Sequence, residues 1–448
     1  MNDDTLTTTY RPVIGLEVHV ELSTASKMFC RCSSDYFGQD PNTHTCPVCL
    51  GLPGALPVPN KKAIEGCIMI GLALSCEIAL FSNFDRKHYF YPDLPKGYQI
   101  SQYQSPFAQK GFIMLSNNKK IRIRRVHMEE DTGKLLHQDL DSRAVSLIDF
   151  NRSGVPLVEI VTEPDFDDAE QVKEYLQKLQ QIIRYLNVAT ANPDKGEMRF
   201  EPNISLRKAN EKDLPNYKVE VKNINSFSFV ERAINYELRR QSSILESGET
   251  PTQETRGWDE KRHITVGQRS KEEAMDYRYF PEPDIPPFRW RTEEIDEFRR
   301  AIPELPDEKK ARFIQNYHIT DYDAELLTRE RRLADFFEEA VKVGQGHGID
   351  PKTIANVLIN KKIDVETTVP AELIKDIVAS RKIEAIDETE LQAIIQEAIT
   401  NNPKAVEDYK KGKTNAVMFL VGASMRKLKG KASAERVKEL ILAYLDAI

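Results

Sequence analysis

Four cysteines near the N-terminus are spaced as ligands of one metal ion. They form two pairs, Cys30 with Cys32 and Cys46 with Cys49, and 13 residues separate the pairs. Four thiolates in two pairs are what a tetrahedral structural zinc ion requires, so the sequence predicts a zinc loop over residues 30–49. Because the first pair encloses one residue instead of the usual two to four, unrelated reduced cysteines in a surface loop remain the alternative.

A second group that could do chemistry consists of carboxylates and one histidine on strand-like segments. Apolar and polar residues alternate near the N-terminus, which places Glu17 and His19 on one face of a half-buried strand, about 7 Å apart. Glu129, Glu130 and Glu159 occur in two other strand-like segments among apolar neighbours. Carboxylates with one imidazole suit Mg²⁺ or Mn²⁺, which usually arrive with nucleotide phosphates. The alternative is that each carboxylate is merely paired with an arginine or lysine.

An aromatic and basic stretch at residues 84–99 is punctuated by glycine and proline, so it cannot form a regular helix. It could stack a base and hold phosphate, although loop aromatics also commonly cover the edge of a core. Neither a Walker-type loop nor a Gly-x-Gly-x-x-Gly sequence occurs, so any ATP site must be of another kind. A Gly-x-Ser-x-Gly sequence is also absent, and we do not expect the chain to hydrolyse an amide itself.

Length and composition limit the classes of protein to which this chain can belong. The 448 residues predict two to four domains, and 63 basic against 70 acidic side chains give a net charge of −7, which argues against a histone-like basic coat. The longest apolar stretch, between Cys67 and Cys76, is too short to span a membrane, and these two cysteines are expected in the core. The N-terminus carries acid where a signal peptide would carry base. We therefore expect a cytoplasmic protein that does not bind membranes.

The elements that must position these residues change character along the chain. Up to about residue 290 the pattern is α+β, and from there to the end it is almost uninterruptedly helical. A break is expected near residues 381–387, before a bundle of short helices; residues 401–448 hold 10 Lys and Arg against 5 Asp and Glu. We expect strands at 13–22, 121–131, 157–161, 199–207 and 218–222, and helices at 61–79, 168–186 and 226–248.

Seven motifs in this sequence, taken in order, closely resemble those of the GatB family, which provides one of the subunits of tRNA-dependent amidotransferases. The similarity runs nearly end to end, and several long motifs in the right order are far more specific than any one of them. The motifs lie at residues 13–22, 84–93, 99–102, 127–131, 222–227, 276–284 and 419–422.

The resemblance implies a fold and a reaction. The fold would be α+β, with an N-terminal cradle similar to the catalytic core of glutamine synthetase. The reaction would be that of a carbon–nitrogen ligase: Mg²⁺ and ATP phosphorylate the side-chain carboxylate of Glu-tRNA(Gln) or Asp-tRNA(Asn), and ammonia then displaces the phosphate. A partner amidase (GatA) would release the ammonia from glutamine, and a small third protein (GatC) would hold the two together. Which of the two tRNAs is preferred does not follow from the motifs.

By the same resemblance, particular residues acquire roles. His19, Glu130 and Glu159 are expected to be magnesium ligands, with Glu17 and Glu129 beside them as further catalytic residues. Zinc at the four cysteines would be structural, since some members carry it and others lack it.

Lys87 is expected to contact phosphate, and the chain would divide into three domains. Residues 1–290 would form the catalytic cradle, 291–382 a helical domain shorter than in most members, and 383–448 a helical tail that binds tRNA through its basic surplus.

Two other functions compete with this one. The chain could be a catalytically silent, zinc-containing RNA-binding scaffold, which would predict no ATP turnover. It could also be a ligase that amidates a free amino acid, which the basic tail disfavours.

Overall fold

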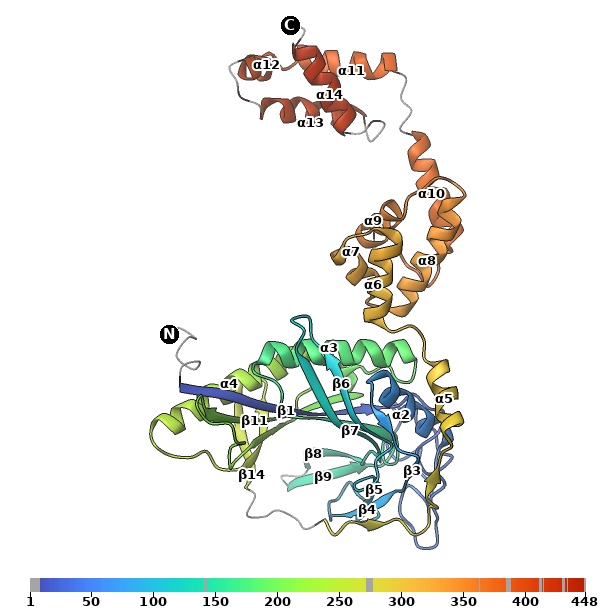
Figure 1. Cartoon of the computed structure of the whole chain (residues 1–448), viewed down its shortest axis with the longest axis vertical. Helices are drawn as coiled ribbons and strands as arrows, with labels where there is room; N and C mark the ends of the chain where they lie inside the picture. Colours follow the sequence, from blue (N-terminus) through green and yellow to red (C-terminus); the bar gives the residue numbers. More distant parts are fainter. Residues whose placement is uncertain are drawn as a thin grey trace. The chain divides into compact units, whose positions relative to one another are not determined.

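A computed structural model describes residues 9–140, 143–270, 277–361, 363–383, 388–410, 413, 415–428, 432 and 434–446. The chain divides into two compact units, Met1–Lys309 and Lys310–Ile448. The first unit combines sheets with helices, whereas the described elements of the second unit are helices. The predicted α+β class is therefore confirmed (Figure 1). The domain boundaries expected near residues 290 and 382 stay predictions.

The first unit is built on a large sheet, nine-stranded over the described residues, with the order β14-β13-β12-β11-β1-β10-β7-β6-β2. Neighbouring strands are antiparallel except for the parallel pair β12 and β13. The strands are β1 (Tyr10–Glu21), β2 (Glu77–Ile78), β6 (Ala108–Met114), β7 (Lys120–Glu130), β10 (Pro156–Thr162), β11 (Met198–Lys208), β12 (Val219–Lys222), β13 (Glu254–Asp259) and β14 (Ile264–Ser270).

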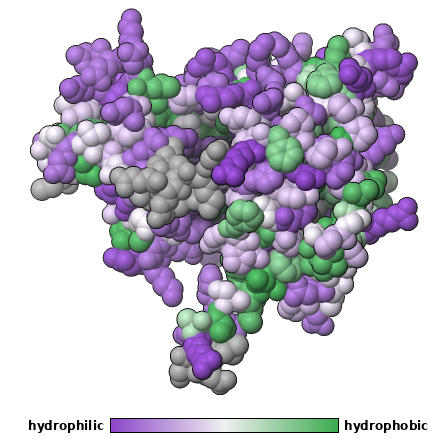
Figure 2. All heavy atoms as spheres, turned by 90° about the horizontal axis from the view of Figure 1, so that it is seen from below, coloured by the Kyte–Doolittle hydropathy of each residue, from purple (hydrophilic) through white to green (hydrophobic). Residues whose placement is uncertain are grey.

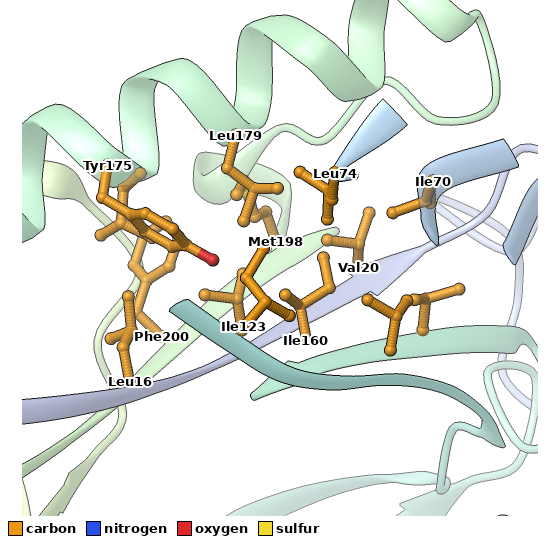
Figure 3. Packing of buried hydrophobic residues seen from close by; sticks show 14 of the residues in the cluster. Leu16, Val20, Ile70, Leu74, Ile123, Ile160, Tyr175, Leu179, Met198 and Phe200 are labelled. Atoms are coloured by element: carbon orange, nitrogen blue, oxygen red, sulfur yellow. The ribbon is translucent and has the colours of Figure 1, made fainter. Parts of the chain in front are cut away.

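Three helices cover one face of this sheet: α2 (Lys61–Ala73), α3 (Ala169–Leu186) and α4 (Phe227–Glu246) (Figure 1). Asn60, Asp168 and Ser226 cap their first turns by accepting hydrogen bonds from backbone N–H groups. The apolar face of the sheet packs against the apolar stripes of the helices. Figure 3 shows this buried layer, to which strands and helices contribute Leu16, Val20, Ile70, Leu74, Ile123, Ile160, Tyr175, Leu179, Met198 and Phe200.

Smaller sheets lie on the other side of the large sheet (Figure 1). They are β15 (Phe280–Pro281) with β4 (Asp85–His88) and β5 (Tyr98–Ser101), β16 (Phe288–Arg289) with β3 (Phe81–Ser82), and the hairpin of β8 (Lys134–Leu140) and β9 (Arg143–Asp149). Seen from below, this side of the molecule is mainly hydrophilic, with scattered hydrophobic residues (Figure 2). The outer surface on this side therefore contrasts with the apolar layer between the large sheet and the helices.

The first unit ends with α5 (Thr292–Ala301) and the start of α6 (Pro306–Tyr317). Two separate hydrophobic clusters stabilise the second unit, one formed by α6 to α10 and one by α11 to α14. No helix among the described residues is both long and apolar enough to cross a membrane. The further helices are α7 (Asp321–Thr328), α8 (Arg331–Gln345), α9 (Pro351–Asn360), α10 (Pro370–Ile383), α11 (Glu388–Thr400), α12 (Pro403–Lys410), α13 (Ala416–Leu428) and α14 (Ala434–Asp446).

Most predicted elements are confirmed, but the helix expected at 61–79 is too long. It ends at Ala73, because Ser75 adopts a left-handed backbone with φ of 58° and the chain then enters β2. The apolar pattern continued past the end of the helix since β2 also borders the core. Part of the break expected at 381–387 lies outside the described residues; α10 extends to Ile383.

We expect Leu179→Ala to lower the free energy of unfolding of the first unit by about 2–5 kcal/mol, because the side chain is fully buried between α3 and the sheet. Denaturant unfolding followed by circular dichroism measures the change. Gln177→Ala, on the exposed side of the same helix, is the control and should change stability by less than about 0.5 kcal/mol. Equal effects of the two substitutions would mean that this layer is not the core.

Candidate active site

The antiparallel register brings ionisable residues from three central strands into one row. His19 on β1 lies opposite Glu159 on β10, and Glu159 lies opposite His127 on β7. Because cross-strand partners point to the same face of a sheet, all three side chains project from the polar face, away from the helices. The row therefore follows directly from strand pairing.

The distances within this cluster are short. His127 Nε2 lies 3.1 Å from a Glu159 oxygen and 3.4 Å from a Glu129 oxygen. His19 Nε2 lies 3.8 Å from Glu159 and 3.9 Å from Glu129. One ligand atom from each of His19, Glu129 and Glu159 lies within 4.8 Å of the others. Two carboxylates and an imidazole at this spacing are a donor set that fits a hard divalent cation.

Burial and charge act against each other in this cluster. Burial would raise the pKa values of Glu129 and Glu159, and repulsion from Glu159 would raise that of Glu129 further. Both pKa values are nevertheless held below their usual range, chiefly by His127, with Lys87 acting on both carboxylates and His19 on Glu159. For His127, burial lowers the pKa, but the two carboxylates outweigh it and raise the pKa to about 9. The carboxylates are thus ionised, as metal ligands must be.

Lys87 enters the cluster from β4, across from the large sheet. Lys87 is half-buried, and its ammonium group lies 5.0 Å from the centre of the Tyr277 ring and 5.9 Å from that of Tyr89. Burial lowers its pKa, but attraction to the carboxylates of Glu129 and Glu159 raises the pKa above its usual value. The structure therefore places a permanent positive charge beside the carboxylate pair.

The two adjacent glutamates at the end of β7 have different surroundings. Glu129 accepts hydrogen bonds from Ser101 Oγ at 2.8 Å and Gln99 Nε2 at 3.3 Å, both on β5. Glu130 instead pairs with the ammonium group of Lys96 and accepts a 3.0 Å hydrogen bond from the backbone of Ile100. In this arrangement Glu129, and not Glu130, lies with His19 and Glu159.

Glu17, the remaining predicted acid, belongs to a neighbouring acidic group with Glu201 of β11 and Glu220 of β12, again within 4.8 Å. Lys222 Nζ lies 2.6 Å from Glu201, and Asn203 donates a 3.1 Å hydrogen bond to Glu17. Burial, with repulsion from Glu159 and the two partners, raises the pKa of Glu17. The sequence analysis missed Glu201 and Glu220, although Glu201 lies in the strand predicted at 199–207 and Glu220 in the strand predicted at 218–222.

Comparison with known proteins identifies the family. A model described as the GatB/GatE catalytic domain matches residues 12–296, which contain the whole cluster, and a model described as the GatB domain matches residues 348–445. The chain belongs to the GatB family.

Curated relatives of this GatB-family chain are named as the B-type subunit of an aspartyl/glutamyl-tRNA(Asn/Gln) amidotransferase. Those of Carboxydothermus hydrogenoformans and Thermotoga maritima are both 45% identical, over 96% and 98% of this chain and 98% and 99% of their own lengths. The relative of Caldicellulosiruptor saccharolyticus is 45% identical over 98% of this chain and all of its own. The alignments span 477 to 483 residues, so these relatives contain residues that the 448-residue chain lacks.

The four predicted zinc ligands of this GatB-family chain also come together. One sulfur atom from each of Cys30, Cys32, Cys46 and Cys49 lies within 4.8 Å of the others, and the sulfurs of Cys46 and Cys49 are 3.8 Å apart. Zn–S bonds of about 2.3 Å in a tetrahedron require sulfur atoms roughly 3.8 Å apart, so the donor set fits zinc. Cys67 and Cys76 are buried in the core, as predicted.

A further ion-pair group that the sequence analysis missed is centred on Arg199 of β11, which lies opposite His19 of β1. Arg199 donates a 2.7 Å hydrogen bond to Asp131 and lies 3.8 Å from Glu21, and both carboxylates are buried. The Tyr36 hydroxyl donates to Glu21 at 3.0 Å. Burial and the neighbouring Asp131 raise the pKa of Glu21 to about 8. Through Arg199, the group adjoins the cluster at His19.

We expect Arg199→Met to lower the free energy of unfolding by about 3 kcal/mol, because it removes one of the two arginines that neutralise the buried carboxylate of Asp131. Thermal or denaturant unfolding measures the loss. Arg122→Met, which breaks the pair of the exposed Arg122 with Asp165, is the matched control and should cost about 1 kcal/mol or less. A loss for Arg199→Met no larger than for this control would refute the buried role of the pair.

Proposed function

We propose that this chain is the transamidating component of a glutamine-dependent aspartyl/glutamyl-tRNA(Asn/Gln) amidotransferase, a carbon–nitrogen ligase. The proposal rests on the cluster of His19, Glu129 and Glu159 with Lys87, which lies inside the region matched by the family's catalytic domain. The names of its relatives supply the substrates: Glu-tRNA(Gln) and Asp-tRNA(Asn). Conversion gives Gln-tRNA(Gln) and Asn-tRNA(Asn).

The chemistry proceeds in two displacements. A carboxylate oxygen of the aminoacyl side chain attacks the γ-phosphorus of ATP, and ADP leaves with the bond electrons. Ammonia then attacks the acyl carbon, loses a proton and expels inorganic phosphate, which leaves an amide. The first step brings two anions together, so cationic groups must offset their repulsion.

We assign that cationic role to Lys87 and to bound Mg²⁺. His19 and Glu159 would hold the metal together with one carboxylate of the Glu129 and Glu130 pair. In the described arrangement Glu129 is the nearer one, and Glu130 would have to leave Lys96 to replace it. When bound, Mg²⁺ supplies charge neutralisation for the phosphates and a template for their orientation. Lys87 contributes a fixed ammonium group beside them, and Glu17 lies one row further along β1.

Three finer assignments belong to the same proposal. The large sheet, with α2, α3 and α4 over one face and the cluster on the other, would be the cradle that resembles the catalytic core of glutamine synthetase. The amidase GatA, held in place by the small protein GatC, would deliver ammonia. The tail, residues 383–448, would bind tRNA through its basic surplus, while the helical domain at 291–382 would be shorter than in most members.

Structural zinc at the four cysteines is also part of the proposal, because their sulfur spacing matches tetrahedral coordination. The site would tie the loop at residues 30–49 to one arrangement beside the cradle. It is separate from the carboxylate cluster, and we assign it no catalytic step.

The purified chain should carry about one zinc ion, and Cys46→Ser should lose it, because a tetrahedral site then lacks one thiolate. Metal content by plasma mass spectrometry gives the answer directly. Cys67→Ala, which removes a buried thiol outside the group, should retain the metal. Zinc-free wild-type protein, purified without chelators, would instead support reduced cysteines without a metal.

The proposed function is tested by amidation of Glu-tRNA(Gln), and separately Asp-tRNA(Asn), with Mg²⁺, ATP and ammonium chloride, which replaces the amidase. Glu159→Gln should lower the rate by about 10²-fold or more, because a ligand carboxylate becomes a neutral amide. Glu174→Gln, on α3 at the opposite face of the sheet, is the matched control and should retain the rate. Comparing Glu129→Gln with Glu130→Gln identifies the third ligand.

Product formation that needs ATP and disappears in Glu159→Gln supports the proposal and names the substrate. If the isolated chain forms no product, the assay is repeated with the co-expressed amidase and small third protein. Continued absence of product there would reject the enzyme and favour the silent scaffold.

A further inference from the structure

A fully buried lysine stands at the start of the loop that contains the four cysteines. Lys27 precedes Cys30 by three residues, and its side chain is completely shielded from solvent. Its backbone N–H donates a 3.0 Å hydrogen bond to the carbonyl oxygen of Cys32, which fixes the residue to the loop. Neither the carboxylate cluster nor the proposed reaction uses this lysine. Its buried ammonium group therefore needs another explanation.

The ammonium group of Lys27 has hydrogen-bond acceptors but no carboxylate partner. Its Nζ atom donates to the carbonyl oxygens of His44 at 2.7 Å and Phe150 at 3.3 Å. It forms no ion pair with an aspartate or glutamate in the part of the chain that the structure describes. An ammonium group removed from water is costly without a counter-charge, and two neutral carbonyl groups do not supply one. The negative charge must come from another kind of group.

The cysteine thiolates can supply this negative charge. A Cβ atom added at Gly154 would lie 3.6 Å from the Cβ of Cys49 and 3.6 Å from the Cδ of Lys27, so these two side chains flank the same point. A hydrogen bond with Cys30, and after it the charge of Lys27, lower the pKa of the Cys49 thiol to about 5, although burial raises it. A dication bound by four thiolates leaves two negative charges uncompensated. A nearby buried ammonium group offsets one of them.

Two other cations near the loop are less suited to this role. Arg31 lies between two of the cysteines but is exposed, so water and salt screen its charge. Lys96 packs against the chain just beyond the loop, but its ammonium group pairs with Glu130. Of these three cations, Lys27 is the one that is both buried and without a carboxylate.

We propose that Lys27 is the counter-charge of the four-cysteine site, a positioning residue whose buried ammonium group offsets the repulsion among four thiolates gathered around zinc. The proposal rests on the zinc binding proposed above. It explains why a lysine without a carboxylate partner is tolerated in the interior. It also predicts that the affinity of the loop for zinc depends on a residue that is not itself a ligand.

The same ammonium group connects the loop to the chain between β9 and β10. Phe150, whose carbonyl oxygen it binds, directly follows β9. The side chain of Asn42 strengthens this connection, because its Nδ2 donates to the carbonyl oxygen of Ile148 at 3.0 Å and its Oδ1 accepts from the backbone of Phe150 at 2.8 Å. Lys27 therefore stands where the metal loop meets the base of the β8–β9 hairpin.

The experiment measures the Kd of zinc by competition with a chromophoric chelator for the full-length wild type, Lys27→Met and Lys61→Met. Methionine keeps the apolar stem of lysine but carries no charge. Lys61, the first residue of α2, has an exposed side chain, so Lys61→Met removes the same charge from the surface and is the matched control. We expect Lys27→Met to raise the Kd about tenfold or more and Lys61→Met to leave it unchanged. Unfolding midpoints confirm that both variants fold.

A second readout separates charge from packing, since a disturbed loop would also bind zinc more weakly. Four thiolates in a tetrahedron bind iron as well as zinc, and the potential of such an iron site responds to the charges around it. Removing the ammonium group makes the added electron less favourable. In iron-substituted protein, Lys27→Met should therefore shift the Fe³⁺/Fe²⁺ midpoint potential to a more negative value, and Lys61→Met should not.

An unchanged zinc Kd in folded Lys27→Met overturns the proposal. If zinc binding weakens while the iron potential stays the same, Lys27 supports the loop by packing alone, and its role as counter-charge is wrong. Wild-type protein that binds no zinc would reject the proposed zinc site itself, which is a separate outcome. Should Lys27→Met not fold, Lys27→Gln, which keeps a hydrogen-bond donor without the charge, gives the same two comparisons.

Discussion

Two buried carboxylates, Glu129 and Glu159, lie close together on neighbouring strands, and the rest of the catalytic half depends on keeping them ionised. Removed from water and placed side by side, they would take up protons and lose their charge. Positive charge must therefore come from elsewhere in the chain. His127 supplies it from the same row of the sheet, and Lys87 supplies it from the small sheet opposite. The small sheet is thus part of the electrostatics of the site and not merely its cover.

That arrangement requires a sheet whose two faces differ completely. A strand reverses the direction of its side chains at every residue, so the same β1 can bury Leu16, Val18 and Val20 under the helices while presenting Glu17 and His19 on the other side. A slip by one residue would exchange the two sets. The large apolar layer beneath α3 therefore determines the register, and the register places the charges. Stability and chemistry come from opposite faces of the same strands.

Sequence patterns predicted much of this architecture because the signals were local. Alternation located β1, β7 and β11, and helical periodicity located α3, α4 and the helices of the tail. The pairing of β8 with β9 was missed because both strands are largely exposed, which leaves little apolar alternation to detect. Helix α2 was drawn too long because apolar character continues into β2.

The site was only partly predictable, for a different reason. His19, Glu159 and Lys87 could be singled out from residue type and resemblance, whereas the role of His127 depends on its position opposite Glu159 across a strand pair. Residue type suggests chemistry, but register decides which residues meet.

The central position of β1 has a consequence for how this protein is made. Its partners are synthesised long after it: Leu16 bonds to Thr162, 146 residues later, and Val13 to Ser205, 192 residues later. At typical synthesis rates the N-terminal strand would wait on the order of 10 s or more at the ribosome before either neighbour exists. During that time its apolar face has no native partner strand and is open to wrong pairings. A strand that is made early and lies at the centre of its sheet must therefore stay unpaired until both of its neighbours have been synthesised.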